Sequence, residues 1–240
     1  MNKNRIESYS LASDSWGAEE IEAINSVIKS NRYTMGPKVK KFEEEFAQYF
    51  GTNYGIMVNS GSSANLLMIA SLFLSNEYDL NKGDEVIVPA VSWSTTYYPV
   101  SQYGLKLVFV DIDRATLNID IDEVIKAINP KTKVIFAVNL LGNPCDFERL
   151  QSLCNEKNII LIEDNCESLG AKYKKQYTGT FGIMGSFSFF FSHHMQTMEG
   201  GMIVTNSKKL YELCVSLRAH GWIRDLPDNH TLQSKTGTLC

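Results

Sequence analysis

Two adjacent histidines, His193 and His194, are the residues of this sequence best suited to proton transfer, because an imidazole changes its charge near neutral pH. Ser188 precedes the pair, and a Glu199-Gly-Gly turn follows it. Earlier in the chain, Asp164 ends an apolar run, and a carboxylate at the end of a parallel strand lies where α/β sheets bind ligands. These residue types predict an enzyme site that works by moving protons.

A metal site is the first alternative, because His193, His194 and Glu199 are possible zinc ligands. Adjacent residues point in different directions, however, and the spacing differs from the H-E-x-x-H arrangement of zinc enzymes. The five cysteines are scattered and form no C-x-x-C pair, which disfavours a disulfide framework, a metal site and an iron–sulfur cluster. We therefore expect no bound metal. A second alternative stays open, in which His193 is purely structural and the protein is inactive.

A serine-rich segment, Ser60-Gly-Ser-Ser-Ala64, separates an apolar run from a helical pattern. Small residues let a backbone approach a phosphate closely, and a helix N-terminus offers free N–H groups and a positive dipole end. Any serine-rich helix start has this composition, so the segment alone does not identify a phosphate site. For Asp164, in the same way, capping of a following helix is the alternative to a role in binding.

Taken together, these segments resemble fold-type I pyridoxal-phosphate enzymes, in particular the DegT/DnrJ sugar aminotransferase family. Residues 60–64 are similar to the S-G-T-A-A loop of that family, and residues 163–170 to its E-D-x-x-x-x-x-G motif. Residues 188–201 resemble its S-F-x-x-x-K-x-x-x-x-G-E-G-G stretch, with His193 at the position of the lysine. The resemblance covers nearly all of residues 1–225.

The resemblance implies a cofactor, pyridoxal 5′-phosphate or pyridoxamine 5′-phosphate, held without a covalent bond because an imidazole cannot form a Schiff base. Asp164 is expected to pair with the ring nitrogen, and Trp93 to stack on the ring. Glu167 stands where many family members have glutamine and is expected to face the ring hydroxyl or the histidine. The residues expected to contact the phosphate are Gly61, Ser62, Ser63 and Ser188.

Two further residues follow from the family's R-x-H-G-x-x-R pattern, to which the segment from Arg218 to Arg224 is similar. His220 and Arg224 are expected to bind substrate, since a guanidinium binds a phosphate or carboxylate with two N–H groups. An exposed arginine after a helix is the alternative. The sequence assigns no role to His194 or to Asn139, which falls where family members have a polar residue near the ring.

The histidine in place of lysine resembles those family members that are 3-dehydratases of nucleotide-linked 4-keto-6-deoxy sugars. The resemblance implies removal of the sugar's C3 hydroxyl with His193 as the base and glutamate as the amino donor, in deoxysugar and lipopolysaccharide biosynthesis. A nucleotide-sugar aminotransferase is the alternative, disfavoured because the motif has no lysine. An inactive, truncated cofactor-binding homologue is the other alternative.

Composition excludes other classes of protein. The 240 residues are 44% hydrophobic and 21% charged, which is ordinary for a globular protein. A net charge of −4 without a Lys/Arg-rich stretch argues against nucleic-acid binding. No apolar run approaches the roughly 18 residues of a membrane span. The start, MNKNRIESYS, lacks the apolar core of a signal peptide, so we expect a cytoplasmic protein.

Short apolar runs alternate with helical patterns, which predicts an α/β fold with a mostly parallel sheet of seven strands and flanking helices. The predicted strands are Tyr54–Val58, Glu85–Pro89, Lys106–Val110, 133–138, 159–163, 186–191 and 202–205. Helices are predicted near residues 38–51, 120–128 and 146–156, after Ser207, and through Leu66, Leu67 and Ile69 after the serine-rich segment.

We predict three segments: an N-terminal helical segment (1–36), a large cofactor-binding domain (37–224) and an irregular tail (225–240). The tail is polar and has little periodicity, so we expect a truncation there. Family members continue into a second, smaller domain, which is apparently missing here, and the resemblance implies a homodimer for the full-length protein.

Overall fold

A computed structural model describes residues 10–12, 15–226, 230 and 232. Its centre is a seven-stranded sheet in the order β1-β9-β8-β5-β4-β2-β3. The strands are β1 (Tyr54–Val58), β2 (Glu85–Pro89), β3 (Lys106–Val110), β4 (Thr132–Val138), β5 (Ile160–Asp164), β8 (Met184–Ser188) and β9 (Gly201–Thr205). Only β9 pairs antiparallel with its neighbours in this sheet, and the pairs from β8 to β3 are parallel. The predicted α/β fold is confirmed.

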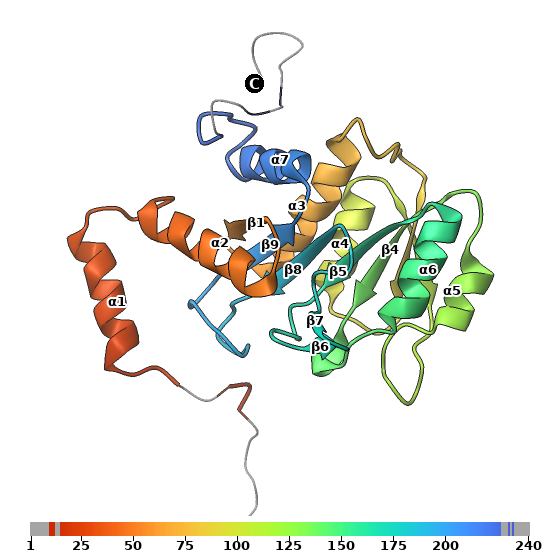
Figure 1. Cartoon of the computed structure of the whole chain (residues 1–240), viewed down its shortest axis with the longest axis horizontal. Helices are drawn as coiled ribbons and strands as arrows, with labels where there is room; N and C mark the ends of the chain where they lie inside the picture. Colours follow the sequence, from red (N-terminus) through yellow and green to blue (C-terminus); the bar gives the residue numbers. More distant parts are fainter. Residues whose placement is uncertain (1–9, 13–14, 227–229, 231, 233–240) are drawn as a thin grey trace, which may run out of the picture.

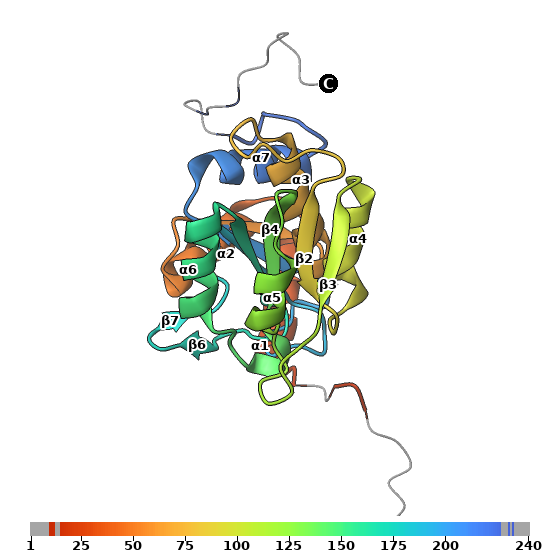
Figure 2. The ribbon, with the colours of Figure 1, turned by 90° about the vertical axis from the view of Figure 1, so that its right-hand side faces the viewer.

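Helices cover both faces of the sheet (Figures 1 and 2). They are α1 (Ala18–Lys29), α2 (Pro37–Phe50), α3 (Gly61–Leu74), α4 (Ser94–Gln102), α5 (Ile121–Ala127), α6 (Phe147–Lys157) and α7 (Lys208–Arg218), with a 3₁₀ turn at Leu140–Gly142. Helices α3, α4 and α7 share one hydrophobic core with the sheet, α5 and α6 a second, and α2 a third, rich in phenylalanine. A small hairpin, β6 (Lys172–Tyr173) and β7 (Gln176–Tyr177), stands apart.

The alternation of side chains along β5 decides which residues reach the site. Ile162 belongs to the core under α3, whereas Leu161 belongs to the core under α5 and α6. Because successive side chains of a strand point to opposite faces, Asp164 shares the face of Ile162 and Glu163 that of Leu161. The carboxylate of Asp164 therefore enters the layer of α3, and that of Glu163 enters the layer of α5 and α6.

Strand β8 (Met184–Ser188) begins and ends earlier than the predicted 186–191. The Phe189 N–H still donates to Gly200 O (2.8 Å), but the Phe190 N–H donates to Ser188 Oγ (3.3 Å) and leaves the pairing with β9. This early end places the Ser188 side chain at the edge of the sheet, where it lines a cavity.

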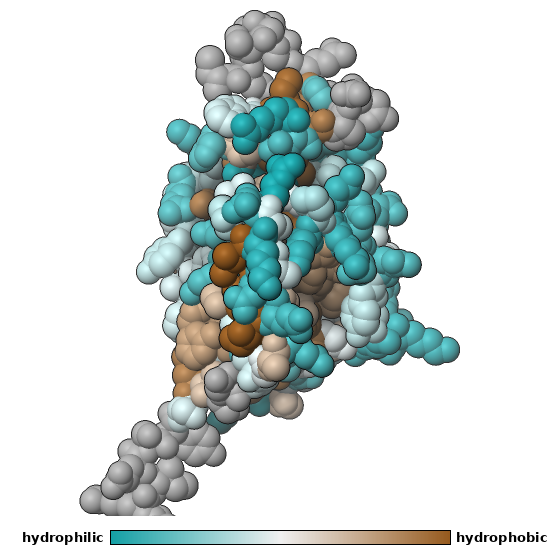
Figure 3. Space-filling view, turned by 90° about the vertical axis from the view of Figure 1, so that its left-hand side faces the viewer, coloured by the Kyte–Doolittle hydropathy of each residue, from teal (hydrophilic) through white to brown (hydrophobic). Residues whose placement is uncertain are grey.

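Helix α1 has no buried residue and lies at the side of the molecule (Figure 1). Ile21 and Ile28 expose 52% and 54% of their surface. Figure 3 shows hydrophobic side chains gathered along one side of this region, beside a hydrophilic row. No helix in the described part of the chain combines the length and apolar composition needed to cross a membrane.

Candidate functional site

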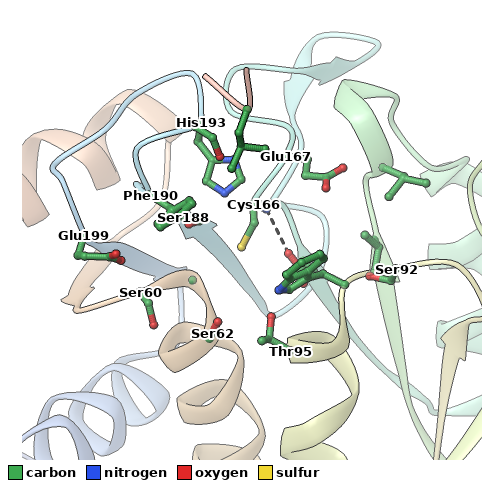
Figure 4. A pocket seen from close by; sticks show the side chains of 17 residues that line it. Ser60, Ser62, Ser92, Thr95, Cys166, Glu167, Ser188, Phe190, His193 and Glu199 are labelled. Carbon is green, nitrogen blue, oxygen red and sulfur yellow. Dashed lines mark hydrogen bonds between the residues drawn. The ribbon is translucent and has the colours of Figure 1, made fainter. Parts of the chain in front are cut away.

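A cavity of about 440 Å³ opens where β4, β5 and β8 end and where α3 begins (Figure 4). Its lining is mostly apolar in area, with a few converging polar groups, as ligand sites usually are. The lining residues are Leu11, Ser60, Gly61, Ser62, Ser92, Trp93, Thr95, Val138, Leu140, Asp164, Cys166, Glu167, Ser188, Phe190, Ser192, His193 and Glu199. The cavity thus gathers most of the predicted site residues from segments far apart in the chain.

Asp164, the last residue of β5, is 5% exposed. Its Oδ2 accepts hydrogen bonds from Asn65 Nδ2 and Thr96 Oγ1, both at 2.8 Å, and its Oδ1 accepts the Cys166 N–H at 3.1 Å. These three donors fix the orientation of the Asp164 side chain. The helix-cap alternative does not hold, since the residues after Asp164 form turns rather than a helix.

The N-terminus of α3 forms the opposite wall of the cavity. Ser60 caps the helix, because its Oγ accepts the Ser63 N–H at 3.1 Å. The N–H groups of Gly61 and Ser62 come before the first intrahelical bond, in which Ala64 N–H donates to Ser60 O (3.0 Å). These two N–H groups are therefore available to an anion in the cavity.

Gly61 shows how tightly this wall is built. A Cβ at Gly61 would lie 2.7 Å from both Cys166 Sγ and Ser188 Cβ, closer than atoms approach. The backbone at Gly61 therefore packs directly against the Cys166 thiol and the Ser188 side chain, which leave no room for a side chain at position 61. Ser63 faces the cap at Ser60 and is absent from the lining, so the structure separates it from Gly61 and Ser62.

His193 lies on the opposite side of the cavity from Ser60 and Ser62, in the segment after β8 (Figure 4). Burial lowers the pKa of His193 below its ordinary value of 6.5, an effect that the charges of Glu167 and Asp164 oppose and that of His194 reinforces. The imidazole is therefore mostly neutral at pH 7 and able to accept a proton. His194 is exposed and does not line the cavity.

Trp93 and Glu167 complete the rim. Trp93 is 73% exposed although it lines the cavity, so its indole is free to cover a ligand. Glu167 accepts the Leu141 N–H with its Oε2 at 3.0 Å, which ties the loop after β5 to the loop after β4.

The structure keeps His220 and Arg224 out of the cavity lining. Both lie beyond α7, where the Arg224 guanidinium stacks over the Trp222 ring at 4.3 Å and pairs with Asp225 at 3.6 Å. Their substrate-binding role stays a prediction. Most of the predicted tail, 225–240, lies outside the described residues.

Asn139 serves the fold instead of the cavity. It is fully buried, and its Nδ2 donates to Glu163 Oε2 and to Asn165 Oδ1, each at 3.2 Å. Its Oδ1 accepts the Cys145 N–H at 3.0 Å. All three bonded groups therefore belong to the frame behind the site.

Glu163, beside Asp164, anchors a loop through its two oxygens. Oε1 accepts the N–H groups of Phe181 (2.6 Å) and Gly182 (2.7 Å), and Oε2 accepts that of Gly179 (2.6 Å). Burial raises the pKa of this carboxyl to about 7, against the lowering effect of these N–H groups and of Asn139. We call this arrangement, Glu163 with loop 178–182, the Glu163 clasp.

Sequence reasoning missed several residues that shape the site. Cys166, Phe190, Ser92 and Thr95 line the cavity, and Asn65 and Thr96 hold Asp164 from beneath. One signal was available for Asn65, because an amide in the otherwise apolar run Ala64-Asn-Leu-Leu-Met68 needs a polar partner.

The cavity fits a phosphorylated pyridine cofactor. The free N–H groups of α3 and the Ser188 hydroxyl suit a phosphate, and the Asp164 carboxylate suits a protonated ring nitrogen. The described lining contains no lysine, so the cavity offers histidine where an amine would bond to an aldehyde. Nor does the described part of the chain gather three or more His, Cys, Asp or Glu side chains into a metal site.

Comparison with known proteins points the same way. Residues 14–238 match the model of the DegT/DnrJ/EryC1/StrS aminotransferase family. GDP-4-keto-6-deoxy-D-mannose 3-dehydratase of Yersinia pseudotuberculosis is 54% identical over 229 residues, 95% of this chain and 58% of that protein. GDP-perosamine synthase of Escherichia coli O157:H7 is 36% identical over 204 residues, 85% of this chain and 54% of that protein.

Solved structures show the same similarity. A crystal structure of a histidine-to-asparagine variant of GDP-4-keto-6-deoxymannose 3-dehydratase with bound GDP-perosamine superimposes with a TM-score of 0.90 at 54% identity, covering 93% of this chain and 58% of that one. The Escherichia coli enzyme with bound hydrated pyridoxal phosphate gives 0.89 at 55% identity, covering 92% and 57%. The chain therefore spans somewhat more than half the length of these relatives.

Proposed function

The chain belongs to the DegT/DnrJ/EryC1/StrS aminotransferase family, and we propose that it acts as a 3-dehydratase of a GDP-linked 4-keto-6-deoxy sugar. This activity would depend on pyridoxal or pyridoxamine phosphate. The observation that carries the proposal is a half-buried histidine, His193, facing the cavity at the position of the family's lysine. Relatives that are 54% and 55% identical bear the name of this dehydratase. Glutamate is the proposed amino donor.

When bound, pyridoxamine phosphate supplies an amine that condenses with the sugar's C4 ketone and a ring that accepts electrons. The residues of the chain do the rest. Asp164 holds the proton of the ring nitrogen, and the start of α3 together with Ser188 binds the phosphate. Neutral His193 would take a proton from the cofactor carbon that bears the amine, and as imidazolium it would donate that proton to the C3 hydroxyl oxygen, which leaves as water.

The histidine supports the choice of dehydratase over aminotransferase. An imidazole holds and returns a proton but forms no covalent bond with an aldehyde, whereas a lysine does both. Non-covalent binding can be checked by borohydride reduction in the presence of pyridoxal phosphate, after which no active-site peptide should carry a stable pyridoxyl group.

The deciding experiment follows the nitrogen atom. The protein is incubated with a GDP-linked 4-keto-6-deoxy sugar, pyridoxal phosphate and glutamate, and the products are analysed by mass spectrometry and an ammonia assay. We expect a sugar that has lost one oxygen atom, with one ammonia and one 2-oxoglutarate per turnover. An amino sugar without released ammonia would identify an aminotransferase instead.

We further propose that the protein works as a homodimer in the cytoplasm. The rim of the cavity exposes large apolar side chains, with Leu11, Trp93 and Leu141 each 73% exposed, and α1 adds Ile21 and Ile28. Apolar surface of this extent favours association, and a second copy of the chain is the proposed partner. Sedimentation equilibrium gives the test, since a monomer at micromolar concentration would contradict the proposal.

A further inference from the structure

We infer that Asn65 and Thr96 are positioning residues that fix the orientation of the Asp164 carboxylate and leave its other oxygen for a ligand in the cavity. Both side chains are fully buried, and buried polar groups cost free energy unless they are hydrogen-bonded. Both donate to Asp164 Oδ2 at 2.8 Å. The inference deepens the proposed function and rests on it, since its purpose is to keep a ring nitrogen protonated.

The direction of the Asn65 amide is fixed from behind by β8. Ser186 Oγ lies 2.6 Å from Asn65 Oδ1 and donates to it. A flipped amide would place its oxygen against the carboxylate of Asp164, where two acceptors would face each other. In the orientation described, Nδ2 donates to Asp164 and also reaches the Thr95 carbonyl at 3.4 Å.

The direction of the Thr96 hydroxyl is fixed in a similar way, by a neighbouring serine. Its hydroxyl has a single hydrogen, which goes to Asp164, so the neighbouring Ser92 Oγ at 2.9 Å donates to Thr96 Oγ1. Two chains of donors, one from Ser186 through Asn65 and one from Ser92 through Thr96, therefore end on one oxygen. That oxygen, and with it the plane of the Asp164 carboxylate, is therefore held from two directions.

The second oxygen of Asp164 remains for the ligand. Oδ1 accepts the N–H of Cys166 at 3.1 Å, and a carboxylate oxygen has capacity for a further hydrogen bond. Asp164 lines the cavity, so a protonated ring nitrogen can supply that bond. The donors on Oδ2 thus set the orientation of the Asp164 carboxylate.

Helix α3 joins this task to phosphate binding. Asn65 stands four residues after Gly61, one turn further along the same side of the helix. The helix is packed between α4, α7 and strands β8 and β9, so its rotation is restricted. One rigid element therefore places the N–H groups for the phosphate and the amide that holds Asp164.

The experiment measures binding of pyridoxal 5′-phosphate to the whole chain, by absorbance, together with the pH at which the absorbance of the bound ligand changes. Asn65→Leu and Thr96→Val remove one donor each. Each should raise the Kd on the order of tenfold, because a hydrogen bond to a charged group is lost. Each should also lower, by about one unit, the pH at which the ring nitrogen of the bound ligand loses its proton, because a carboxylate that has rotated no longer faces that nitrogen.

Two further variants serve as controls. Thr96→Ser keeps the hydroxyl and should restore wild-type affinity and pH dependence. Ser71→Ala removes another fully buried polar side chain of α3, whose Oγ donates to Met68 O rather than toward Asp164, and should bind like the wild type. Thermal unfolding of all four variants shows whether they fold.

Wild-type Kd and transition pH in both Asn65→Leu and Thr96→Val would overturn the inference. If Asn65→Leu does not fold, the Thr96→Val and Thr96→Ser pair decides, since valine replaces threonine with almost no change of shape. Failure of the wild type to bind pyridoxal phosphate would overturn the proposed function instead, and the two failures are therefore distinguishable.

Discussion

Glu163 and Asp164 are chemically similar neighbours on β5, yet they serve opposite faces of the sheet. Glu163 accepts three N–H groups from loop 178–182 and one from Asn139, and no atom of it is exposed. Asp164 accepts two side-chain donors and one N–H, and it still lines a cavity. A carboxylate with four donors is saturated and stabilises the fold, whereas one with spare capacity beside a cavity can bind a ligand.

The largest effect on the catalytic side is expected from His193→Asn, which removes the base and keeps a polar side chain of similar reach. Turnover should fall on the order of 10²–10⁴-fold, the usual contribution of one proton-transfer group. The affinity for pyridoxal phosphate should hardly change, because His193 is not among the groups proposed to bind the phosphate or the ring nitrogen. Ammonia release measures turnover, and a near wild-type rate would exclude His193 as the base.

Asp164→Asn tests the functional half of the comparison. The amide keeps the shape and loses the charge, so turnover should fall on the order of 10²–10³-fold, as when a preorganised electrostatic group is removed. Its carbonyl oxygen can still accept from Asn65 and Thr96, and its NH₂ group faces one donor, the Cys166 N–H, where the amide of Glu163→Gln faces two, so the free energy of unfolding should fall by only about 1 kcal/mol. Turnover close to the wild-type rate would return Asp164 to a structural role.

Glu163→Gln tests the other half and should reverse this pattern. Whichever way the amide is placed, its NH₂ group faces two donors: Phe181 and Gly182, or Gly179 and Asn139. We expect the free energy of unfolding to fall by about 2–4 kcal/mol, measured by urea denaturation. Turnover per folded molecule should change less than in Asp164→Asn.

A surface carboxylate provides the control for Glu163. Glu148 pairs with Lys174 at 3.0 Å in an exposed position, and Glu148→Gln should change the free energy of unfolding by less than about 1 kcal/mol. If Glu163→Gln were no more destabilising than this control, the Glu163 clasp would not stabilise the fold.

The smallest effect concerns pH. Burial lowers the pKa of His193 below 6.5, so the base should be lost, and turnover with it, only as the pH falls below 6.5. Glu167 is the main charge that raises this pKa, so Glu167→Gln should move the acid limb of the rate profile to lower pH. A shift to higher pH would show that Glu167 does not act on His193.

Local patterns predicted the sheet and much of the site. Short apolar runs between helical patterns predicted all seven strands, and the motifs around Gly61, Asp164 and His193 identified residues that line one cavity. The partners of Asp164 could not be predicted this way. Asn65 and Thr96 lie on two helices distant from it in sequence, and only the packing of α3 and α4 on the sheet brings them together.

The same limit explains why the role of Glu163 was not foreseen. A carboxylate at the end of an apolar strand suggests a ligand site whichever face it enters, and the alternation along β5 separates the two neighbours only once the register is known. The hairpin of β6 and β7 has strands of two residues each, too short for periodicity to indicate.

The pairing of β1 with β9 has a consequence for the kinetics of folding. Gly201, the first residue of β9, lies so close to the cap of α3 that a Cβ there would be 2.3 Å from Ser60 O, and it pairs with Val58 across more than half of the chain. Closing such a distant pair is slow and late, since the loop entropy must be lost before the contact forms. Pyridoxal phosphate should therefore leave the refolding rate unchanged and slow unfolding, because the cavity that binds it is complete only after β9 has paired with β1.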